Sequence, residues 1–589
     1  MRRLLIHKQE FSLWRIHTLI FFFLFLFLLV EFRLFFTQVI DHKKYKTMAE
    51  NQYWNVQELP ARRGNILSSD GQLFAGTKFN YLMYGEPNKI TDKYKTAHTL
   101  AQNLAELRNK DFNDYYNKFF DLLSLDLMWI ALEKNLAPAE KTEIEKLKLE
   151  GLGFEEEPVR YYPEPSLASA VLGFVAFNEE GNKRGYFGIE GKLNEDLKGR
   201  PGRIIQEIDA AGRPILAGGY KKVDPVQGRN IVLTIDRAVQ HIAEKKIKEG
   251  VTKYNAVSGS ILIMDPLTGD IYAMANYPTY EPGDLAVDET EYEDKTMRRK
   301  KVEKRNLTIS QTYEPGSVMK PLTIATAIDL GIASPQTTYE DNGPVWYSDY
   351  KIDNWDGKHY GTMNIIKLLQ KSNNIGAAWV GHQIGAQKLY EYLKNFGLGT
   401  KTNIELEGED SGILNDYKSW YDIDLATISF GQGESASPLQ VLNAFNALAN
   451  GGYVLEPKII SKLIDDNKES EIPTRIVRRV ISEDTSKTMV SLLEDAASGG
   501  EAQFFVLKNY RIAGKTGTAQ IPEGGKYDPN KTNCTFAGFM AGSRKFSMII
   551  KLEEPLSSIY AAETAVPLWM ETAQELVKYF GLPPDKVSN

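Results

Sequence analysis

A serine and a lysine stand three residues apart in the segment "TYEPGSVMKP", which begins at Thr312. Pro315 and Gly316 predict a turn that leads directly into a helix. Because residues three apart on a helix are neighbours, we expect the amine of Lys320 within reach of the Ser317 hydroxyl. Free backbone N–H groups at the start of a helix favour negative charge at such a serine. The pattern predicts a nucleophilic serine whose proton is taken by a lysine.

A lysine is a base near pH 7 only if its surroundings lower its pKa. Lowering that pKa from about 10.4 to near 7 costs about 4 kcal/mol, which burial and a neighbouring cation supply. The segment "GKTGT", 514–518, offers the cation in Lys515, on a predicted strand where it pairs with a carboxylate or steers protons. Gly517 would let an extended peptide pass close to the strand edge. A phosphate-binding P-loop is excluded because position 509 is asparagine rather than glycine.

A third polar segment, "KSNNIGA", begins at Lys371. Ser372 is placed to relay a proton between the two lysines, and Asn374 to offer its amide to a substrate carbonyl. Each of the three segments is weak alone, since S-x-x-K recurs by chance and S-x-N also resembles a helix N-cap. Together, in this order along one chain, they are a strong indication of serine acyl-transfer chemistry.

The composition limits the partners. With 589 residues the chain is too long for one core, which indicates two or more domains outside any membrane. A net charge of −7 argues against a nucleic-acid partner. The single cysteine, Cys534, excludes a disulfide framework and a thiolate metal site, and its apolar surroundings predict a buried, inert thiol.

The segment from Ile16 to Phe36 is the exception to a globular composition. Leu19 to Val30 is unbroken apolar sequence, and the whole stretch can cross about 30 Å of hydrocarbon as a helix. No small-residue cleavage site follows, so we interpret it as an uncleaved anchor. Residues 1–15 are then a cytoplasmic stub, and the chain after about residue 40 lies outside the cytoplasm.

Strand and helix patterns divide the rest of the chain near residue 226. In 45–225, strands flank a turn at 69–71 and the pattern from 93 to 149 is helical, but no catalytic constellation occurs. We expect a spacer or interaction module there.

Residues 226–585 predict an α/β sandwich with a mostly antiparallel sheet. A hairpin turns at 266–269, and helices dominate from 317 to 450. Three successive strands and a C-terminal helix close the domain. The charged stretch 284–305 is expected to be a mobile surface loop.

With these motifs in place, the chain resembles a class B penicillin-binding protein, a peptidoglycan transpeptidase, along nearly its whole length. "EPGSVMKP" together with "KSNNIGA" is more similar to the division-specific (septal) type than to the elongation type. Glu434 departs from the apolar residue usual after Gly-Gln-Gly, and Ser437 replaces a usual threonine. The segments that carry the resemblance are "RRGNILSSDG", "GIEGKLNEDLKG", "LTIDRAVQ", "MDPLTGDIYAMANYP", "YEPGSVMKP", "KSNNIGAAWVGHQIG", "ISFGQGESASPLQ" and "AGKTGTAQ".

The resemblance implies a mechanism. Lys320 would deprotonate Ser317, which attacks the D-Ala–D-Ala carbonyl of a pentapeptide stem. The backbone N–H groups of Ser317 and Thr518 would form an oxyanion hole. Ser372 and Lys515 would pass the proton to the departing D-alanine.

The resemblance also implies the substrates and inhibitors. Thr516 and Thr518, with Gly517 between them, would hold the substrate carboxylate. An amine of a neighbouring stem would take the acyl group in a 4→3 type cross-link, with D,D-carboxypeptidase activity as a side reaction. β-Lactams would acylate the same serine, and neither a metal nor an organic cofactor is needed.

The expected architecture is a multidomain α+β protein. It comprises a transmembrane helix (16–36), an elongated α/β pedestal of the dimerisation type (45–225), and a serine β-lactamase-like transpeptidase domain (226–585). No polymerising domain is evident in 40–225, so the resemblance implies a polytopic glycosyltransferase partner in the plasma membrane.

Four alternatives stay open. A serine hydrolase with a histidine base would need G-x-S-x-G, but "GESAS" at 433–437 lacks the last glycine and none of the seven histidines is beside Ser317. A soluble β-lactamase would need neither an anchor nor some 200 residues before its domain. A β-lactam sensor would need more than a short cytoplasmic stub for its output. A scaffold that has lost turnover would not need the intact motifs.

Overall fold

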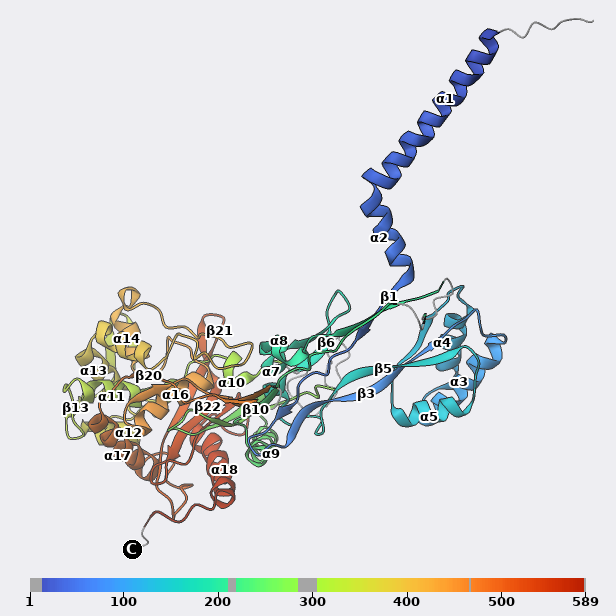
Figure 1. Cartoon of the computed structure of the whole chain (residues 1–589). Coiled ribbons are helices and arrows are strands. Elements are labelled where there is room, and N and C mark those ends of the chain that lie inside the picture. Colours follow the sequence, from blue (N-terminus) through green and yellow to red (C-terminus); the bar gives the residue numbers. More distant parts are fainter. Residues whose placement is uncertain (1–12, 210–214, 216–218, 284–303, 466–467, 587–589) are drawn as a thin grey trace, which may run out of the picture. The chain divides into compact units, whose positions relative to one another are not determined.

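The computed structural model describes residues 13–209, 215, 219–283, 304–465 and 468–586 (Figure 1). The chain divides into two compact units, one of residues 1–61 and 200–226, the other of 62–199 and 227–589. The predicted surface loop at 284–305 lies almost wholly outside the described residues.

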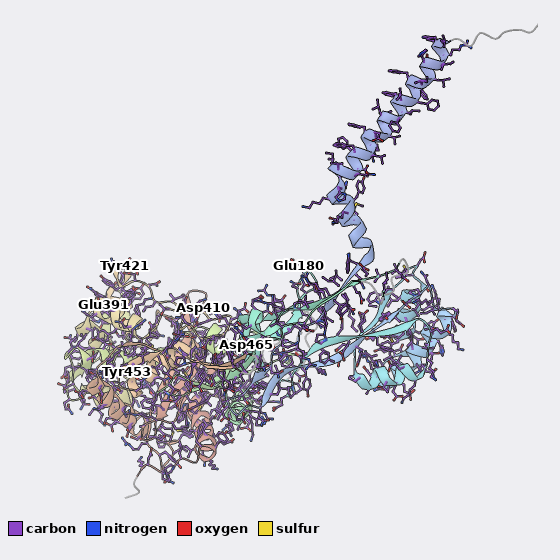
Figure 2. All side chains as sticks on the ribbon, viewed as in Figure 1. Glu180, Glu391, Asp410, Tyr421, Tyr453 and Asp465 are labelled. Carbon is purple, nitrogen blue, oxygen red and sulfur yellow. The ribbon has the colours of Figure 1, made fainter. Side chains whose placement is uncertain are left out.

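The first unit contains the apolar helix that the sequence predicts. Helix α1 (Leu13–Phe35) continues through a π-helical turn, η1 (Phe36–Ile40), and is followed by α2 (His42–Tyr53). Within Leu13–Ile40, the most apolar 18-residue window has a mean hydropathy of 2.5, and none of this window is buried. Figure 2 shows side chains projecting on all sides of α1. The helix is long and apolar enough to cross a membrane.

A small antiparallel sheet completes the first unit. Its strand order is β1-β8-β9, where β1 is Trp54–Leu59, β8 is Gly202–Glu207 and β9 is Tyr220–Val223. Strand β1, which directly follows α2, is therefore paired with a strand about 150 residues later in the chain.

The second unit begins with a seven-stranded sheet. Its order is β19-β18-β10-β2-β3-β4, and β5 also pairs with β3. The predicted turn at 69–71 joins β2 to β3, and Gly71 has the positive φ of 81° that such a turn requires. The strands are β2 (Ile66–Leu67), β3 (Leu73–Gly85), β4 (Ile130–Leu136), β5 (Leu152–Tyr161), β10 (Asn230–Leu233), β18 (Ile460–Asp465) and β19 (Lys468–Glu471).

Helices α3 (Lys93–Arg108), α4 (Phe112–Ser124) and α5 (Pro138–Lys146) confirm most of the helical pattern predicted at 93–149. The prediction was wrong for β4, which lies between α4 and α5. Leu132 and Leu136 are buried four residues apart, a spacing that fits a helix as well as an irregular strand. Antiparallel hydrogen bonding to β3 makes this segment a strand.

A buried ion-pair cluster ties the start of this unit together. Glu190 is fully buried, and its carboxylate accepts from Arg63 and Arg160 at 2.5 Å each. Arg160 also donates to the Gly64 carbonyl at 2.7 Å. The surrounding short elements are α6 (Ser169–Leu172), β6 (Phe174–Phe177), β7 (Lys183–Tyr186), α7 (Gly188–Lys192) and α8 (Asn194–Lys198).

The second sheet of this unit positions the candidate site. It has five antiparallel strands in the order β12-β11-β23-β22-β21. They are β11 (Ser258–Met264), β12 (Ile271–Tyr277), β21 (Ile512–Glu523), β22 (Lys526–Met540) and β23 (Ser547–Glu553). The predicted hairpin and the three predicted successive strands are confirmed. Strand β21 is at the edge, so one row of its backbone groups pairs with no strand of the sheet.

Helices cover both faces of this sheet. Helices α9 (Arg237–Lys253) and α18 (Ala565–Tyr579) pack on one face with the short η4 (Ala561–Glu563), and Trp569 stacks edge-on against Phe536 at 5.3 Å. Cys534 is buried in this core, and burial raises the pKa of its thiol, which confirms the predicted inert cysteine. Helix α16 (Pro438–Ala449) covers the other face.

The helical block predicted at 317–450 is confirmed, with small two-stranded sheets that the sequence did not predict. Its helices are η2 (Gly316–Met319), α11 (Lys320–Asp329), α12 (Ile365–Lys371), α13 (Asn374–Ile384), α14 (Ala386–Asn395), η3 (Tyr417–Ser419) and α15 (Asp422–Ile428), with α10 (Leu307–Ser310) before it and α17 (Glu483–Gly499) after it. The two-stranded sheets pair β13 (Thr338–Asp341) with β16 (Gly361–Asn364), β14 (Val345–Tyr347) with β15 (Tyr350–Ile352) and, after the block, β17 (Tyr453–Leu455) with β20 (Ile476–Arg479).

Candidate active site

Ser317 and Lys320 lie at the junction of two helices. The helix expected to begin at Ser317 starts as the 3₁₀ turn η2, and the α-helix α11 begins only at Lys320. Lys320 Nζ lies 3.0 Å from Ser317 Oγ. The lysine is fully buried, whereas the serine is half-buried. The reach expected from the three-residue spacing is present.

Two glycines hold the turn that precedes the serine. Gly316 has a φ of 59°, and its N–H donates to the Gly431 carbonyl at 2.8 Å. A Cβ on Gly431 would stand 2.0 Å from the Gly316 carbonyl oxygen. The segment "FGQG" therefore supports the nucleophile through backbone contact that no larger residue permits.

The segment "KSNNIGA" directs three oxygens at the same amine. Ser372 ends α12 with a φ of 53°, and Asn373 caps the start of α13. Across this tight turn, Lys320 Nζ lies 2.5 Å from the Ser372 carbonyl, 3.3 Å from Ser372 Oγ and 2.8 Å from Asn374 Oδ1. The amine of Lys320 thus contacts four oxygen atoms, counting Ser317 Oγ.

The "KTGT" segment lies on the edge strand β21. Lys515 Nζ donates to Thr516 Oγ1 at 2.8 Å, and Thr516 Oγ1 donates to Glu501 Oε2 at 2.5 Å. Thr518 Oγ1 accepts from the Ala561 N–H at 3.1 Å. The carboxylate expected near Lys515 is therefore Glu501, reached through the threonine hydroxyl.

Gly517 has a packing reason for being glycine. A Cβ there would meet the Pro315 carbonyl at 2.8 Å and a Val318 methyl at 3.0 Å. The absent side chain therefore lets β21 approach the η2 turn, which brings the edge strand close to Ser317.

Burial sets the charge state of both lysines. Burial is the main cause that holds the pKa of Lys320 well below its ordinary value, and the positive charge of Lys515 lowers it further. Burial also lowers the pKa of Lys515. The Glu501 carboxylate opposes both shifts. Lys515 is therefore close enough for its charge to disfavour the protonated form of Lys320.

Asp341, at the end of β13, was missed by the sequence reasoning. It is fully buried, and its Oδ2 accepts from Asn373 Nδ2 at 2.7 Å and Asn354 Nδ2 at 3.0 Å. Asn354 Oδ1 in turn accepts from the Asn374 N–H at 3.1 Å. Asp341 thus fixes the turn that aims Ser372 and Asn374 at the lysine. No local motif signals it, because its partners lie 13 and 32 residues away.

Glu501 was also missed, for a similar reason. It follows the end of α17 and meets Thr516 only through the tertiary fold. Within the described ranges, no group of three or more His, Cys, Asp or Glu side chains is arranged to hold a metal ion.

Comparisons with known families match two regions. Residues 259–570 match the penicillin binding protein transpeptidase domain, and residues 58–233 match the penicillin-binding protein dimerisation domain. The first match contains Ser317, Ser372 and Lys515 with their neighbours.

Individual proteins are similar along most of the chain. Stage V sporulation protein D of Bacillus subtilis is 29% identical over 571 residues, covering 95% of this chain and 85% of that protein. Peptidoglycan D,D-transpeptidase FtsI of Escherichia coli is 27% identical over 569 residues, covering 94% and 90%. The crystal structure of a peptidoglycan synthetase from Bifidobacterium adolescentis superposes with a TM-score of 0.71 at 25% identity, covering 91% of this chain and 98% of that one.

Proposed function

The chain belongs to the class B penicillin-binding proteins, and we propose that its peptidoglycan D,D-transpeptidase reaction proceeds through an acyl-enzyme at Ser317. One observation carries this assignment: the buried Lys320 amine lies 3.0 Å from Ser317 Oγ. The enzyme joins stem peptides that end in D-Ala–D-Ala, and β-lactams acylate the same serine.

The geometry around Lys320 suits a neutral amine. A neutral amine has two N–H donors and one lone pair. The two nearest carbonyl acceptors, Ser372 O at 2.5 Å and Asn374 Oδ1 at 2.8 Å, take the two donors. The lone pair is then left for the hydroxyl proton of Ser317, which supports Lys320 as the general base.

Acylation breaks one bond and forms another. The oxygen of Ser317 bonds to the carbonyl carbon of the penultimate D-alanine while its proton passes to Lys320. The C–N bond to the last D-alanine breaks, and its nitrogen takes a proton relayed by Ser372 and Lys515. Backbone N–H groups of Ser317 and Thr518 stabilise the oxyanion, a contribution of about 3 kcal/mol per donor in such sites.

Transfer repeats these steps in reverse. The amine of a neighbouring stem attacks the ester carbonyl, the C–O bond to Ser317 breaks, and the amine proton returns to the serine oxygen. In the earlier acylation step, before D-alanine leaves, Thr516 and Thr518 hold the terminal carboxylate of the donor stem. Lys515 and Thr516 are both buried, so the amine of Lys515 and the hydrogen bonds of both side chains act in a site with little competing water.

The remaining parts deliver this site to the cell wall. We assign residues 1–15 to a cytoplasmic stub, 16–36 to a single-pass anchor in the plasma membrane, 45–225 to the pedestal and 226–585 to the transpeptidase domain. The bulk of the chain then lies outside the cytoplasm. Since this family's match covers transpeptidation and dimerisation only, we infer a polytopic glycosyltransferase partner that makes the strands.

The cellular role is division-type cross-linking, which the "EPGSVMKP" and "KSNNIGA" motifs favour and with which the FtsI relative is consistent. The similarity to a stage V sporulation protein favours a second role for the same chemistry, in spore formation. Depleting the protein distinguishes the two roles: filamentous cells indicate division, and normal growth with defective spores indicates sporulation.

Reaction of the purified chain with a pentapeptide donor and an amine acceptor tests the activity. We expect D-alanine release together with a cross-linked product of the calculated mass, and neither from Ser317→Ala. Penicillin binding without any acyl transfer would favour a β-lactam sensor or a scaffold instead.

A further inference from the structure

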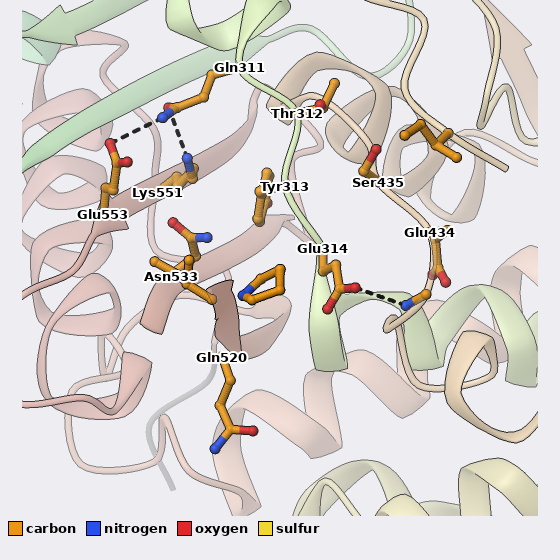
Figure 3. Close-up of a pocket in the computed structure, with 14 residues that line it drawn as sticks. Gln311, Thr312, Tyr313, Glu314, Glu434, Ser435, Gln520, Asn533, Lys551 and Glu553 are labelled. Atoms are coloured by element: carbon orange, nitrogen blue, oxygen red, sulfur yellow. Dashed lines mark hydrogen bonds between the residues drawn. The ribbon is translucent and has the colours of Figure 1, made fainter. Parts of the chain in front are cut away.

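A pocket of about 400 Å³ lies beside the segment that leads into Ser317 (Figure 3). Its walls come from the residues before the nucleophile, the "GQGES" loop and the end of strand β21. Polar and aromatic residues that line it include Gln311, Tyr313, Glu314, Glu434, Ser435, Gln520, Asn533, Lys551 and Glu553. This volume is in the range of small-molecule sites.

Two carboxyl groups share one side of the pocket. Glu314 Oε1 accepts from the Gly433 N–H at 3.1 Å and from the Tyr527 hydroxyl at 3.0 Å. Glu434 is only 3% exposed. Figure 3 shows both carboxyl groups on the same side, with the Gly433 bond between their segments. Burial raises the pKa of both groups, and Glu314 raises that of Glu434 further.

Several buried oxygens of this pocket lack a hydrogen-bond partner among the described residues. They are both carboxyl oxygens of Glu434, Oε2 of Glu314, Oδ1 of Asn533 and Oγ of Ser435. Asn533 is 9% exposed and comes from β22, independently of the two glutamates. Buried polar atoms are nearly always satisfied in native proteins. With both carboxyl groups ionised, all of these atoms except the serine hydroxyl are acceptors only, and a cation with several N–H donors is the ligand that both matches them and favours the ionised state.

The opposite side of the pocket has its own charged pair. Gln311 donates to Glu553 at 3.1 Å and accepts from Lys551 at 2.8 Å. The Lys551 amine also lies 4.9 Å from the centre of the Tyr313 ring. Figure 3 shows this group across the pocket from Glu314 and Glu434. Glu314 and Glu434 therefore lie on the side of the pocket opposite Lys551.

The position along β21 relates the pocket to the substrate. The proposed mechanism places the substrate carboxylate at Thr516 and Thr518 and the reacting carbonyl at the Thr518 N–H. A stem bound along this edge strand therefore continues past Ala519 toward Gln520, advancing about 3.3 Å per residue. The residue that precedes the terminal dipeptide then lies beside the pocket, and a long side chain on that stem residue can reach into it.

We propose that this pocket is a subsite for the free side-chain ammonium group of a diamino acid at the residue preceding D-Ala–D-Ala in the donor stem. Glu434, Glu314 and Asn533 supply its acceptors. The inference rests on the proposed transpeptidase function. It also gives a reason for Glu434, which stands where the family usually has an apolar residue.

Two pentapeptides that end in D-Ala–D-Ala test the subsite. One carries L-lysine at the third position, the other Nε-acetyl-L-lysine, which keeps the length but loses the charge. We measure the second-order rate at which each acylates Ser317, by D-alanine release and mass spectrometry. In the unaltered chain we expect the lysine peptide to react about tenfold faster or more, since hydrogen bonds to charged groups are worth that much.

Glu434→Gln should bring the ratio of the two rates close to one, because the amide keeps the shape but not the charge. Glu523→Gln is the matched control. This exposed residue lies on the hairpin formed by β21 and β22, pairs with Lys531 and does not line the pocket. The control should keep the preference of the unaltered chain.

Penicillin acylation of Ser317 in every variant separates the two proposals. Without it, the proposed function itself fails. With it, equal rates for the two peptides in the unaltered chain, or a preference that survives Glu434→Gln, would overturn the subsite. A preference seen only in transfer to an acceptor amine, and not in acylation, would contradict its assignment to the donor stem.

Discussion

At the scale of single residues, the amine of Lys320 concentrates the chemistry. It has four oxygen neighbours, one from its own S-x-x-K segment and three from "KSNNIGA", and no exposed surface. Burial lowers its pKa first, and the charge of Lys515 lowers it further. The neutral amine needed to accept a proton is thus populated at a pH where an ordinary lysine is charged.

The lysine roles predict a distinct pH dependence. The neutral fraction of Lys320 grows as the pH rises through its lowered pKa, so the penicillin acylation rate should rise with pH and then level off. Lys320→Ala should reduce the rate by about 10² to 10⁴-fold, the usual worth of a general base. Lys515→Arg keeps the charge but changes the donor geometry, so it should slow acylation less.

Replacing Lys515 by methionine removes the nearby charge, so the pKa of Lys320 should rise and the rising limb should move to higher pH. Stopped-flow acylation rates across pH for the three variants check this. If the acylation rate fell by the same factor in all three variants at every pH, separate roles for the two lysines would be contradicted.

At the scale of elements, the turn between α12 and α13 depends on Asp341. Its carboxylate accepts from the side chains of Asn354 and Asn373 and from the Tyr360 N–H. Asp341→Ala would remove the shared acceptor of these three donors, of which Asn354 Nδ2 keeps its bond to the Lys358 carbonyl, and each buried N–H left unpaired would cost about 1 to 3 kcal/mol. We expect penicillin acylation to slow by about tenfold or more, because the turn no longer holds its oxygen atoms in contact with the Lys320 amine.

Asp341→Asn should restore most of that rate, because the amide oxygen accepts the same N–H groups. Asp349→Ala, on the exposed tip between β14 and β15, is the matched control. The acylation step is measured separately from noncovalent penicillin affinity, together with thermal unfolding. A loss explained wholly by a lower melting temperature would show Asp341 to be structural only.

The elements show what the sequence could predict. Strong local patterns were sufficient for the apolar helix, the 258–277 hairpin and strands β21 to β23, because alternation and apolar runs are properties of the segment itself. Strand β4 was missed because its hydrogen bonds come from β3, some 50 residues away. Asp341 and Glu501 were missed for the same reason: tertiary partners, and no local spacing, bring them to the site.

At the scale of the whole molecule, the anchor and the transpeptidase domain are predicted to be separable in chemistry but not in the cell. Deleting residues 1–40 removes α1 and η1 but keeps β1 and its pairing with β8. The shortened, exported chain should be soluble and should react with penicillin at the rate of the full chain. It should fail to support cell-wall synthesis, since nascent strands and the proposed partner are at the membrane.

Growth supported by the exported, anchorless chain at normal levels would show the anchor to be dispensable. It would also remove the main argument for a membrane-embedded polymerase partner. A chain with residues 1–40 replaced by an unrelated single-pass helix is the control, because it restores the membrane location without the native sequence.

The most direct measurement of the central claim is to locate the penicillin adduct. The full chain, in membranes, is treated with penicillin, digested and analysed by mass spectrometry. We expect the added mass on the peptide that contains Ser317, and no labelling of a Ser317→Ala protein that unfolds at the same temperature as the unaltered chain. An adduct on another residue, or labelling that persists in that folded variant, would contradict it.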